Sequence, residues 1–164
     1  MANVFDLVKG TAHVVAESSR LQATTAGHIY DLEMIEDTDN GSIVAVGAVS
    51  DLGVQVFKAK EYAVGDKPCL VLTPPLAYNG KKAWSDEKYF YNAKGDVARA
   101  YELYVGDIYT LSANAFTGTP AVGKFVDATH TIADEAGATG FVGEIIEEVV
   151  YTNGMSYRII VRKA

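Results

Sequence analysis

The chain has 164 residues, of which 49% are hydrophobic and 21% are charged, and this composition indicates one folded domain rather than a disordered chain. The formal net charge of −7 argues against a nucleic-acid partner, because binding to phosphate requires a positive surface. The sequence shows no run of 18 apolar residues and no basic leader, so we expect no membrane partner and synthesis in a cytoplasm.

The N-terminal part of the chain, residues 1–25, is weakly patterned, and we interpret it as an extended arm. The rest, residues 26–164, shows strand periodicity almost throughout and contains no linker. We therefore expect a mainly β fold with little helix, in the form of a single compact β-barrel or sandwich-like domain.

Two strands are expected first in this domain. In HIYDLEMIED (residues 28–37) apolar residues alternate with acids, which predicts a half-buried strand with one wet face. SIVAVGAV (residues 42–49) is apolar on both faces, which predicts a strand covered on both sides. Further strands are expected at VQVFKAKEY (54–62), PCLVL (68–72), both halves of VARAYELYVGDIYTLS (97–112) with a bend at Gly106-Asp107, and GKFVDA (123–128).

The C-terminal region has an ambiguous pattern. In FVGEIIEEVVY (residues 141–151) five aliphatic residues fit one helix face, whereas Gly143 and a β-branched pair favour a strand. Asn153-Gly154 between two apolar runs is a strong hairpin signal, since a type I′ turn needs positive φ at both central residues. We favour a strand with an irregularity near Gly143, paired with MSYRIIVR (155–162). A short helical turn fits residues 130–138.

Five acidic residues gather at the start of IEDTDNGSIVAVG and just before it: Asp31, Glu33, Glu36, Asp37 and Asp39. A calcium loop counted from Asp37 would need glycine at its sixth position and glutamate at its twelfth, and the sequence has neither. Catalytic carboxylates would need a concave, partly dry setting. We therefore interpret the stretch as a strand that ends in a wet acidic tip, with Asn40-Gly41 as the turn. Whether the tip contacts a partner or only solvent is left open.

The remaining candidate motifs give weak signals. Ser85 and Lys88 have the Ser-x-x-Lys spacing of penicillin-binding enzymes, but the companion motifs are absent. Cys69 lies in an apolar run and is interpreted as a small buried hydrophobe. The three histidines show no zinc-ligand spacing: His13, His28 and His130. We expect no catalytic residue, no metal site and no cofactor.

Aromatic residues concentrate in one third of the chain, where Trp84 and Phe90 accompany tyrosines at positions 89, 91, 101, 104 and 109. Such residues build β cores, and where they are exposed they anchor protein–protein contacts. The sequence leaves both interpretations open.

The order of these features carries a resemblance to a known family. The segment DNG…IVAVG is followed by KPCLVLTPPLAY, then by YNAKGDVARAYELYVGDIYTLS, an NG-closed hairpin and the ending YRIIVRKA. This succession resembles the small capsid decoration proteins of tailed bacteriophages, of the head-fibre-base or cement type. The resemblance covers most of the chain in layout, and its motifs are structural rather than catalytic.

The resemblance implies a non-enzymatic structural protein on the capsid surface of a virion, made in the cytoplasm of a bacterial host. Its partners would be the major capsid protein, whose assembled shell it stabilises, and further copies of itself in a homotrimer or another symmetric cluster. The arm residues would lie in a groove of the shell, an aromatic group would pack between protomers, and basic C-terminal residues would meet acidic shell loops. These three groups are Asn3, Val4, Phe5 and Leu7; Tyr89, Phe90 and Tyr91; and Arg158, Arg162 and Lys163. The alternatives are another virion component, such as a head–tail connector or tail protein, and a small-ligand-binding β-barrel or hydrolase.

Overall fold

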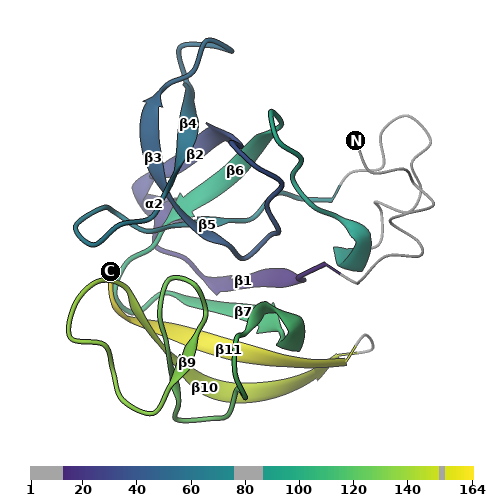
Figure 1. The fold of residues 1–164 in the computed structure, drawn as a ribbon, viewed down its shortest axis with the longest axis vertical. Coiled ribbons are helices and arrows are strands. Elements are labelled where there is room, and N and C mark those ends of the chain that lie inside the picture. The colour runs from purple at the N-terminus through teal and green to yellow at the C-terminus, as the bar shows by residue number, and fades with distance from the viewer. Residues whose placement is uncertain (1–12, 76–86, 152–153) are drawn as a thin grey trace.

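The computed structural model of the chain describes residues 13–75, 87–151 and 154–164, and these residues fold mainly as β-strands (Figure 1). Five strands close a barrel in the order β2-β4-β3-β5-β6. Their bounds are β2 Ile29–Glu33, β3 Ile43–Val49, β4 Val56–Glu61, β5 Cys69–Val71 and β6 Val97–Glu102. The prediction of a mainly β fold containing a barrel is confirmed.

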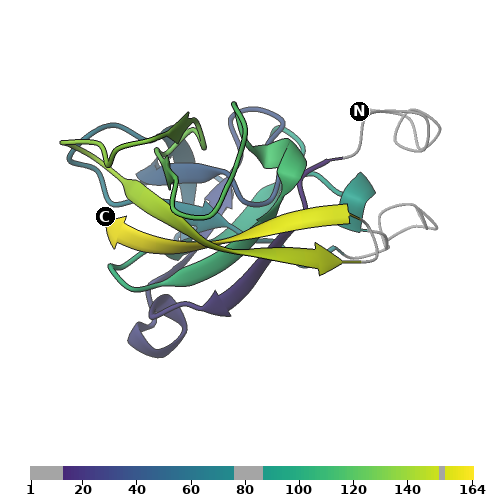
Figure 2. The same cartoon turned by 90° about the horizontal axis from the view of Figure 1, so that it is seen from below.

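A six-stranded sheet in the order β1-β7-β11-β10-β8-β9 accompanies the barrel. Its strands are β1 Ala16–Arg20, β7 Ile108–Ser112, β8 Phe125–Val126, β9 Ile132–Ala133, β10 Val142–Tyr151 and β11 Gly154–Lys163. Helix within the described ranges is limited to three short elements: α2 Ala23–Ala26, η2 Glu87–Tyr89 and η3 Ala113–Ala115. Figure 1 shows β1 between the barrel and the rest of the sheet, and Figure 2 shows β10 and β11 as a long twisted hairpin.

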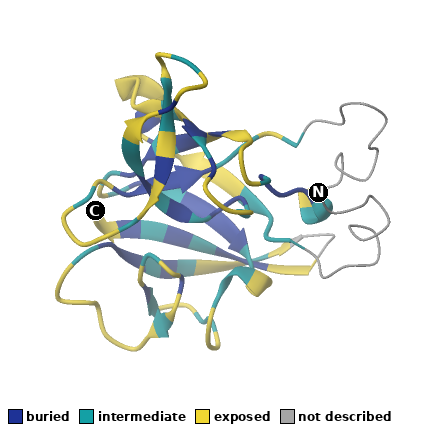
Figure 3. Ribbon diagram, turned by 45° about the horizontal axis from the view of Figure 1, so that its top comes forward, coloured by how far each residue is buried: buried dark blue, intermediate teal, exposed yellow. Residues whose placement is uncertain are grey.

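The barrel and the sheet share a hydrophobic core. One cluster joins Ile43 and Leu70 of the barrel to Leu111 and Ile159 of the sheet. A second cluster fills the barrel around Leu32, with mostly small neighbours. Figure 3 shows the buried positions along the strands that face one another and the exposed positions at the loops. Because the first cluster draws on both sheets, the barrel and the sheet pack as one unit.

The first two predicted strands differ in outcome. In β2 the alternation is confirmed, since Leu32 is buried and Asp31 is exposed. For β3 the expectation of cover on both faces is wrong in its second half, where Val49 is exposed. The physical reason is that the end of β3 and the start of β4 extend beyond the barrel as a projecting hairpin (Figure 1).

The C-terminal segment is a strand and not a helix, as favoured from its sequence. β10 pairs antiparallel with β11, and its register shifts between Val142 and Gly143. A Cβ atom on Gly143 would lie 2.6 Å from Ile159 Cγ2, so glycine is what lets the two strands approach here. The helical turn that fits residues 130–138 is not formed, because Ile132–Ala133 pair with β8 as strand β9.

The segment interpreted as an arm falls into two parts. Residues 1–12 lie outside the described residues. From Ala16 onward the chain belongs to the sheet, because β1 pairs with β7 and Leu21 is buried in the shared core. The folded sheet therefore includes the second half of the segment that was assigned to the arm.

Candidate functional site

The acidic stretch does not form a wet hairpin tip. β4 lies between β2 and β3 in the barrel, so the segment that joins β2 to β3 connects strands that are not neighbours. Asn40 and Gly41 do form a turn, with φ of 91° at Gly41, but the Asn40 residue is only 7% exposed. The expectation of a hairpin turn at Asn40-Gly41 is thus wrong, because this turn packs against Leu111 of the sheet. The acidic residues Glu36 and Asp37 before it are exposed, as expected.

The acidic side chains of this stretch are hydrogen-bond acceptors for distant parts of the chain. Asp39 accepts from the His13 ring, with 2.7 Å between Oδ1 and Nδ1, and from the Val14 amide at 3.3 Å. Asp37 accepts from the Lys94 amide at 2.8 Å. These carboxylates therefore hold the fold together. In the part of the chain that the structure describes, no three histidine, cysteine or acidic residues are grouped to hold a metal ion.

A buried carboxylate that the sequence reasoning missed lies where β5 pairs with β6. Glu102 is 3% exposed and sits opposite Cys69 in the barrel register. Its carboxylate accepts a hydrogen bond from Tyr30 Oη at 3.2 Å and lies 3.2 Å from Lys67 Nζ and from His28 Nδ1. The alternation in β6 could have indicated this buried carboxylate. It places Glu102 on the same face of the strand as Ala98 and Ala100, so that a charged residue lies on an otherwise apolar face.

The pKa values of this cluster follow from burial and hydrogen bonding. Burial alone would raise the pKa of Glu102, but hydrogen bonds from Lys67, Tyr104 and Tyr30 hold it below its ordinary value. Burial, followed by the nearby Glu102 charge, raises the pKa of Tyr30 to about 12. The same two causes raise the pKa of Cys69 to about 12.

This cluster is built to hold a compensated charge. Both carboxylate oxygens of Glu102 already have partners, so neither is left to act as a general base. Cys69 lines the same small hollow as a protonated thiol, which is a poor nucleophile. The geometry supports a structural ion pair that ties β2, β5 and β6 together.

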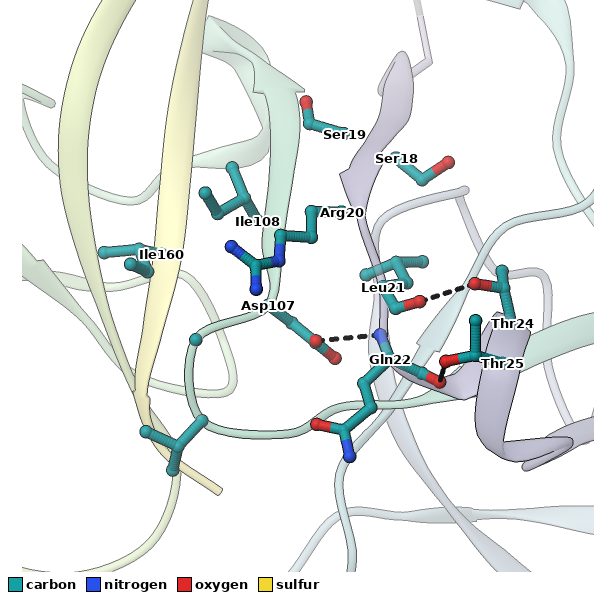
Figure 4. Close-up of a pocket in the computed structure, with 12 residues that line it drawn as sticks. Ser18, Ser19, Arg20, Leu21, Gln22, Thr24, Thr25, Asp107, Ile108 and Ile160 are labelled. Atoms are coloured by element: carbon teal, nitrogen blue, oxygen red, sulfur yellow. Dashed lines mark hydrogen bonds between the residues drawn. The ribbon is translucent and has the colours of Figure 1, made fainter.

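Two hollows lie along strand β1, with volumes of about 640 and 460 Å³, and both are lined by Ser18. Figure 4 shows the larger one, where the Arg20 side chain extends from β1 toward Ile108 and Asp107. Asp107 is already used, since it accepts from the backbone amides of Gln22 and Tyr104 at 2.9 Å each. Within the described ranges, the Arg20 side chain forms no hydrogen bond or ion pair, although the residue itself pairs with Ile108 of β7.

The aromatic residues predicted to pack between protomers are mostly internal. Phe90 and Tyr91 are buried, and the Tyr91 ring stacks on His13 with 4.9 Å between centroids. Only Tyr89 of the three keeps partial exposure. The core interpretation therefore holds for Phe90 and Tyr91. Trp84 and Ser85 lie outside the described residues.

The basic residues predicted to meet the shell all have partners within the chain. Arg158 pairs with Glu147, and Arg162 Nε donates to Glu144 Oε2 at 2.6 Å. Lys163 donates to a backbone carbonyl oxygen, that of Ala138, at 2.6 Å. The arm residues Asn3, Val4, Phe5 and Leu7 lie outside the described residues, so their role stays a prediction.

Exposed aliphatic side chains gather at one end of the barrel. Val49, Leu52 and Val54 lie on the projecting β3–β4 hairpin, and Val54 is 90% exposed. Ile35 and Val97 are exposed as well. They lie at the same end as the hairpin, since Val97 pairs with Glu33, and the Glu33 carboxylate accepts a hydrogen bond from Ser50 of the hairpin. We call these five residues the aliphatic end. Such a group is typical of a surface that binds another protein.

Comparison with known proteins gave no match, whether the sequence was set against protein-family models, curated proteins or solved structures. Among the helices of the described residues, none has the length and apolar character needed to cross a membrane.

Proposed function

We propose that this protein is a non-enzymatic capsid decoration protein of a tailed bacteriophage, and that it binds the outside of the assembled shell through the aliphatic end. The observation that supports a docking role is the projecting hairpin with its exposed Val49, Leu52 and Val54. The class of partner, the major capsid protein, comes from the resemblance in sequence layout.

The hairpin has the properties of a docking element. Each large aliphatic side chain contributes about 1.5–3 kcal/mol when it becomes fully buried, so a few such residues at the centre of an interface supply much of its affinity. The hairpin is also anchored rigidly, since the Ser50 amide donates to the Val56 carbonyl at 2.8 Å and the Ser50 hydroxyl donates to Glu33. Little side-chain and loop entropy is then lost on binding.

Charge indicates what the partner surface offers. Three acidic residues are exposed around the aliphatic end: Glu36, Asp37 and Asp51. A complementary surface is an apolar depression with a basic rim, and opposite charges would steer the encounter. In a symmetric cluster such as a homotrimer, several such contacts form together and raise the apparent affinity.

The test is co-sedimentation of the purified protein with assembled shells that lack it. Replacing Leu52 and Val54 together by lysine should weaken binding at least about tenfold, because two anchors are lost and charge is added. Val122→Lys is the matched control, since Val122 is similarly exposed but lies next to β8 in the sheet, and it should bind as the unmodified protein does.

Two outcomes would overturn the proposal. The first is failure of the unmodified protein to sediment with shells, and the second is equal binding by the hairpin variant and the control. The stoichiometry separates the alternative virion role, because a decoration protein binds in numbers comparable to the shell subunits and a connector binds in only a few copies per particle.

A further inference from the structure

A histidine side chain is buried at one edge of the six-stranded sheet. His130 lies two residues before β9, the last strand of this sheet, and it is only 6% exposed. Its ring nitrogen Nε2 is buried and has no hydrogen-bond partner within the described ranges. Among the described residues, His130 is also the one residue other than glycine with a positive φ, of 57°. Both features cost free energy, so their coincidence at one residue indicates a role for it.

A tight turn directs the His130 ring inward. The Asp127 carboxylate oxygen Oδ1 accepts hydrogen bonds from the amides of Thr129 and Thr131, at 2.8 and 3.0 Å. The His130 amide donates to the Asp127 carbonyl at 3.0 Å, and the His130 carbonyl accepts from the Thr117 amide at 3.1 Å. The backbone is thus fixed on both sides of His130, and these hydrogen bonds hold the residue in its left-handed conformation.

The His130 ring packs among aromatic side chains of the core. The rings of Tyr109 and Phe116 lie edge-on to it, with 6.4 and 6.1 Å between centroids. Phe116 in turn packs edge-on against Tyr157 of β11, with 5.6 Å between centroids. A positive charge on the His130 ring would lose its hydration in these apolar surroundings, so the site favours the neutral ring.

The charged groups around His130 compensate only in part for a proton on its ring. The Asp127 carboxylate on the same turn favours the protonated ring, but burial outweighs it and lowers the pKa of His130 to about 4. Tyr109 of β7 stays uncharged, because burial raises its pKa. Lys124 and Asp134, at the ends of β8 and β9, pair with each other at the surface. Protonation near pH 5 therefore favours a conformation in which the His130 ring reaches water.

The segment that His130 anchors is attached to the sheet by few contacts. We call residues 116–133 the edge segment. Its strands β8 and β9 have two residues each, and within the segment only Val126 and His130 are buried. Beside the short β8–β10 pairing, the Gly123 amide donates to the Ile145 carbonyl of β10 at 2.8 Å. Short strands at a sheet edge with few buried side chains open at lower free energy than the core strands.

We propose that His130 is an acid-sensitive latch: when its ring is protonated, the edge segment detaches from the sheet while the barrel and strands β7, β10 and β11 stay folded. Detachment uncovers Tyr109 and Tyr157, against which His130 and Phe116 pack, so acid presents an apolar surface that is covered at neutral pH. The proposal does not depend on the shell-binding function, because it concerns a change within one chain.

The test is amide hydrogen exchange of the full chain at pH 7 and pH 5, measured residue by residue by NMR and corrected for the intrinsic pH dependence of exchange. The Gly123 amide and the Ile145 amide, which donates to the Lys124 carbonyl, join the edge segment to β10 and report its opening. With pKa values for His130 of about 4 when closed and 6.5 when open, their opening equilibrium should rise about twentyfold at pH 5. Reference amides of the barrel and the sheet, those of Leu72 and Val161, should change less than about threefold.

His130→Asn is the matched control, because asparagine accepts the left-handed φ and does not titrate. In this variant the opening of the Gly123 and Ile145 amides should differ less than about threefold between the two pH values, whatever its stability at pH 7. A twentyfold rise in the variant, or no rise in the unmodified protein, would overturn the proposal. An equal rise at Leu72 and Val161 would also overturn it, since the whole domain would then open together. This comparison of amides within the unmodified protein does not rely on the variant folding.

Discussion

The side-chain amide of Asn40 forms a reciprocal pair of hydrogen bonds with the backbone of Thr73. Asn40 Nδ2 donates to the Thr73 carbonyl at 2.8 Å, and the Thr73 amide donates to Asn40 Oδ1 at 3.0 Å. Asn92 Nδ2 donates to the same oxygen at 3.1 Å. The amide thereby bridges three segments of the chain and satisfies backbone groups that lie beyond the end of β5.

Replacing Asn40 by alanine should lower the free energy of unfolding by about 1–3 kcal/mol, because half-buried backbone groups of Thr73 lose their partners. Urea denaturation monitored by circular dichroism would measure this change. Gln55→Ala is the control, since Gln55 is exposed on the projecting hairpin, and it should stay within about 0.5 kcal/mol of the unmodified protein. A loss at Asn40 no larger than in this control would contradict the bridging role.

Two glycines separate the effect of backbone strain from that of crowding. Gly41 and Gly95 have φ of 91° and 85°, so alanine at either position costs about 1 kcal/mol or more in strain. A Cβ atom on Gly41 would also lie 2.5 Å from Leu111 Cδ2, whereas a Cβ atom on Gly95 has no atom within 4 Å. Gly41→Ala should therefore be less stable than Gly95→Ala by about 1–3 kcal/mol. Equal losses in thermal unfolding would mean that Leu111 moves aside without cost.

Local patterns predicted where most strands lie, because alternation reports which face of a strand is buried. The alternation of β2 and the bend at Gly106-Asp107 between β6 and β7 are of this kind. β1 was missed because its sequence AESSR has no apolar face, and four of its five residues are exposed. An edge strand that relies on its neighbour for pairing leaves little hydrophobic pattern to read.

The pairing of strands could not be predicted in the same way. Asn40-Gly41 predicts a turn, but the same two residues fit an exposed hairpin and a buried connection equally well. Which of the two forms depends on the insertion of β4 between β2 and β3. The surroundings of Glu102 likewise depend on the β5–β6 register that brings Cys69 opposite it. Such contacts join positions far apart in the sequence, so no local spacing encodes them.

His130 should make the stability of the protein depend on pH. Burial is the main reason that the pKa of His130 is lowered from 6.5 to about 4, and the nearby Asp127 carboxylate opposes this shift only in part. The unfolded chain therefore binds a proton at higher pH than the folded chain does. The contribution of His130 to the free energy of unfolding is complete above about pH 6.5 and declines as the pH falls toward 4. This contribution amounts to about 3 kcal/mol.

The control for this prediction is His130→Asn. Asparagine accepts the positive φ of 57° at this position and carries no titrating group. The free energy of unfolding of this variant should change less between pH 7 and pH 4 than that of the unmodified protein, and the comparison is between slopes and not absolute stabilities. Tyr109, whose ring lies 6.4 Å from that of His130, does not titrate in this range because burial raises its pKa. Parallel slopes would show that His130 is not the group responsible.

Cys69 should resist thiol reagents in the folded protein. Burial, followed by the Glu102 charge, raises the pKa of its thiol to about 12, so almost none of it is thiolate at pH 8. The side chain is also fully buried between β3 and β6. Labelling with Ellman's reagent should be at least about a thousandfold slower in buffer than in denaturant, because reaction requires the barrel to open. Glu102→Gln removes the charge and tests the cause of the protection. If burial protects the thiol, labelling of this variant should stay slow. Labelling as fast as in denaturant, without loss of the β circular-dichroism signal, would show that the charge alone protected the thiol.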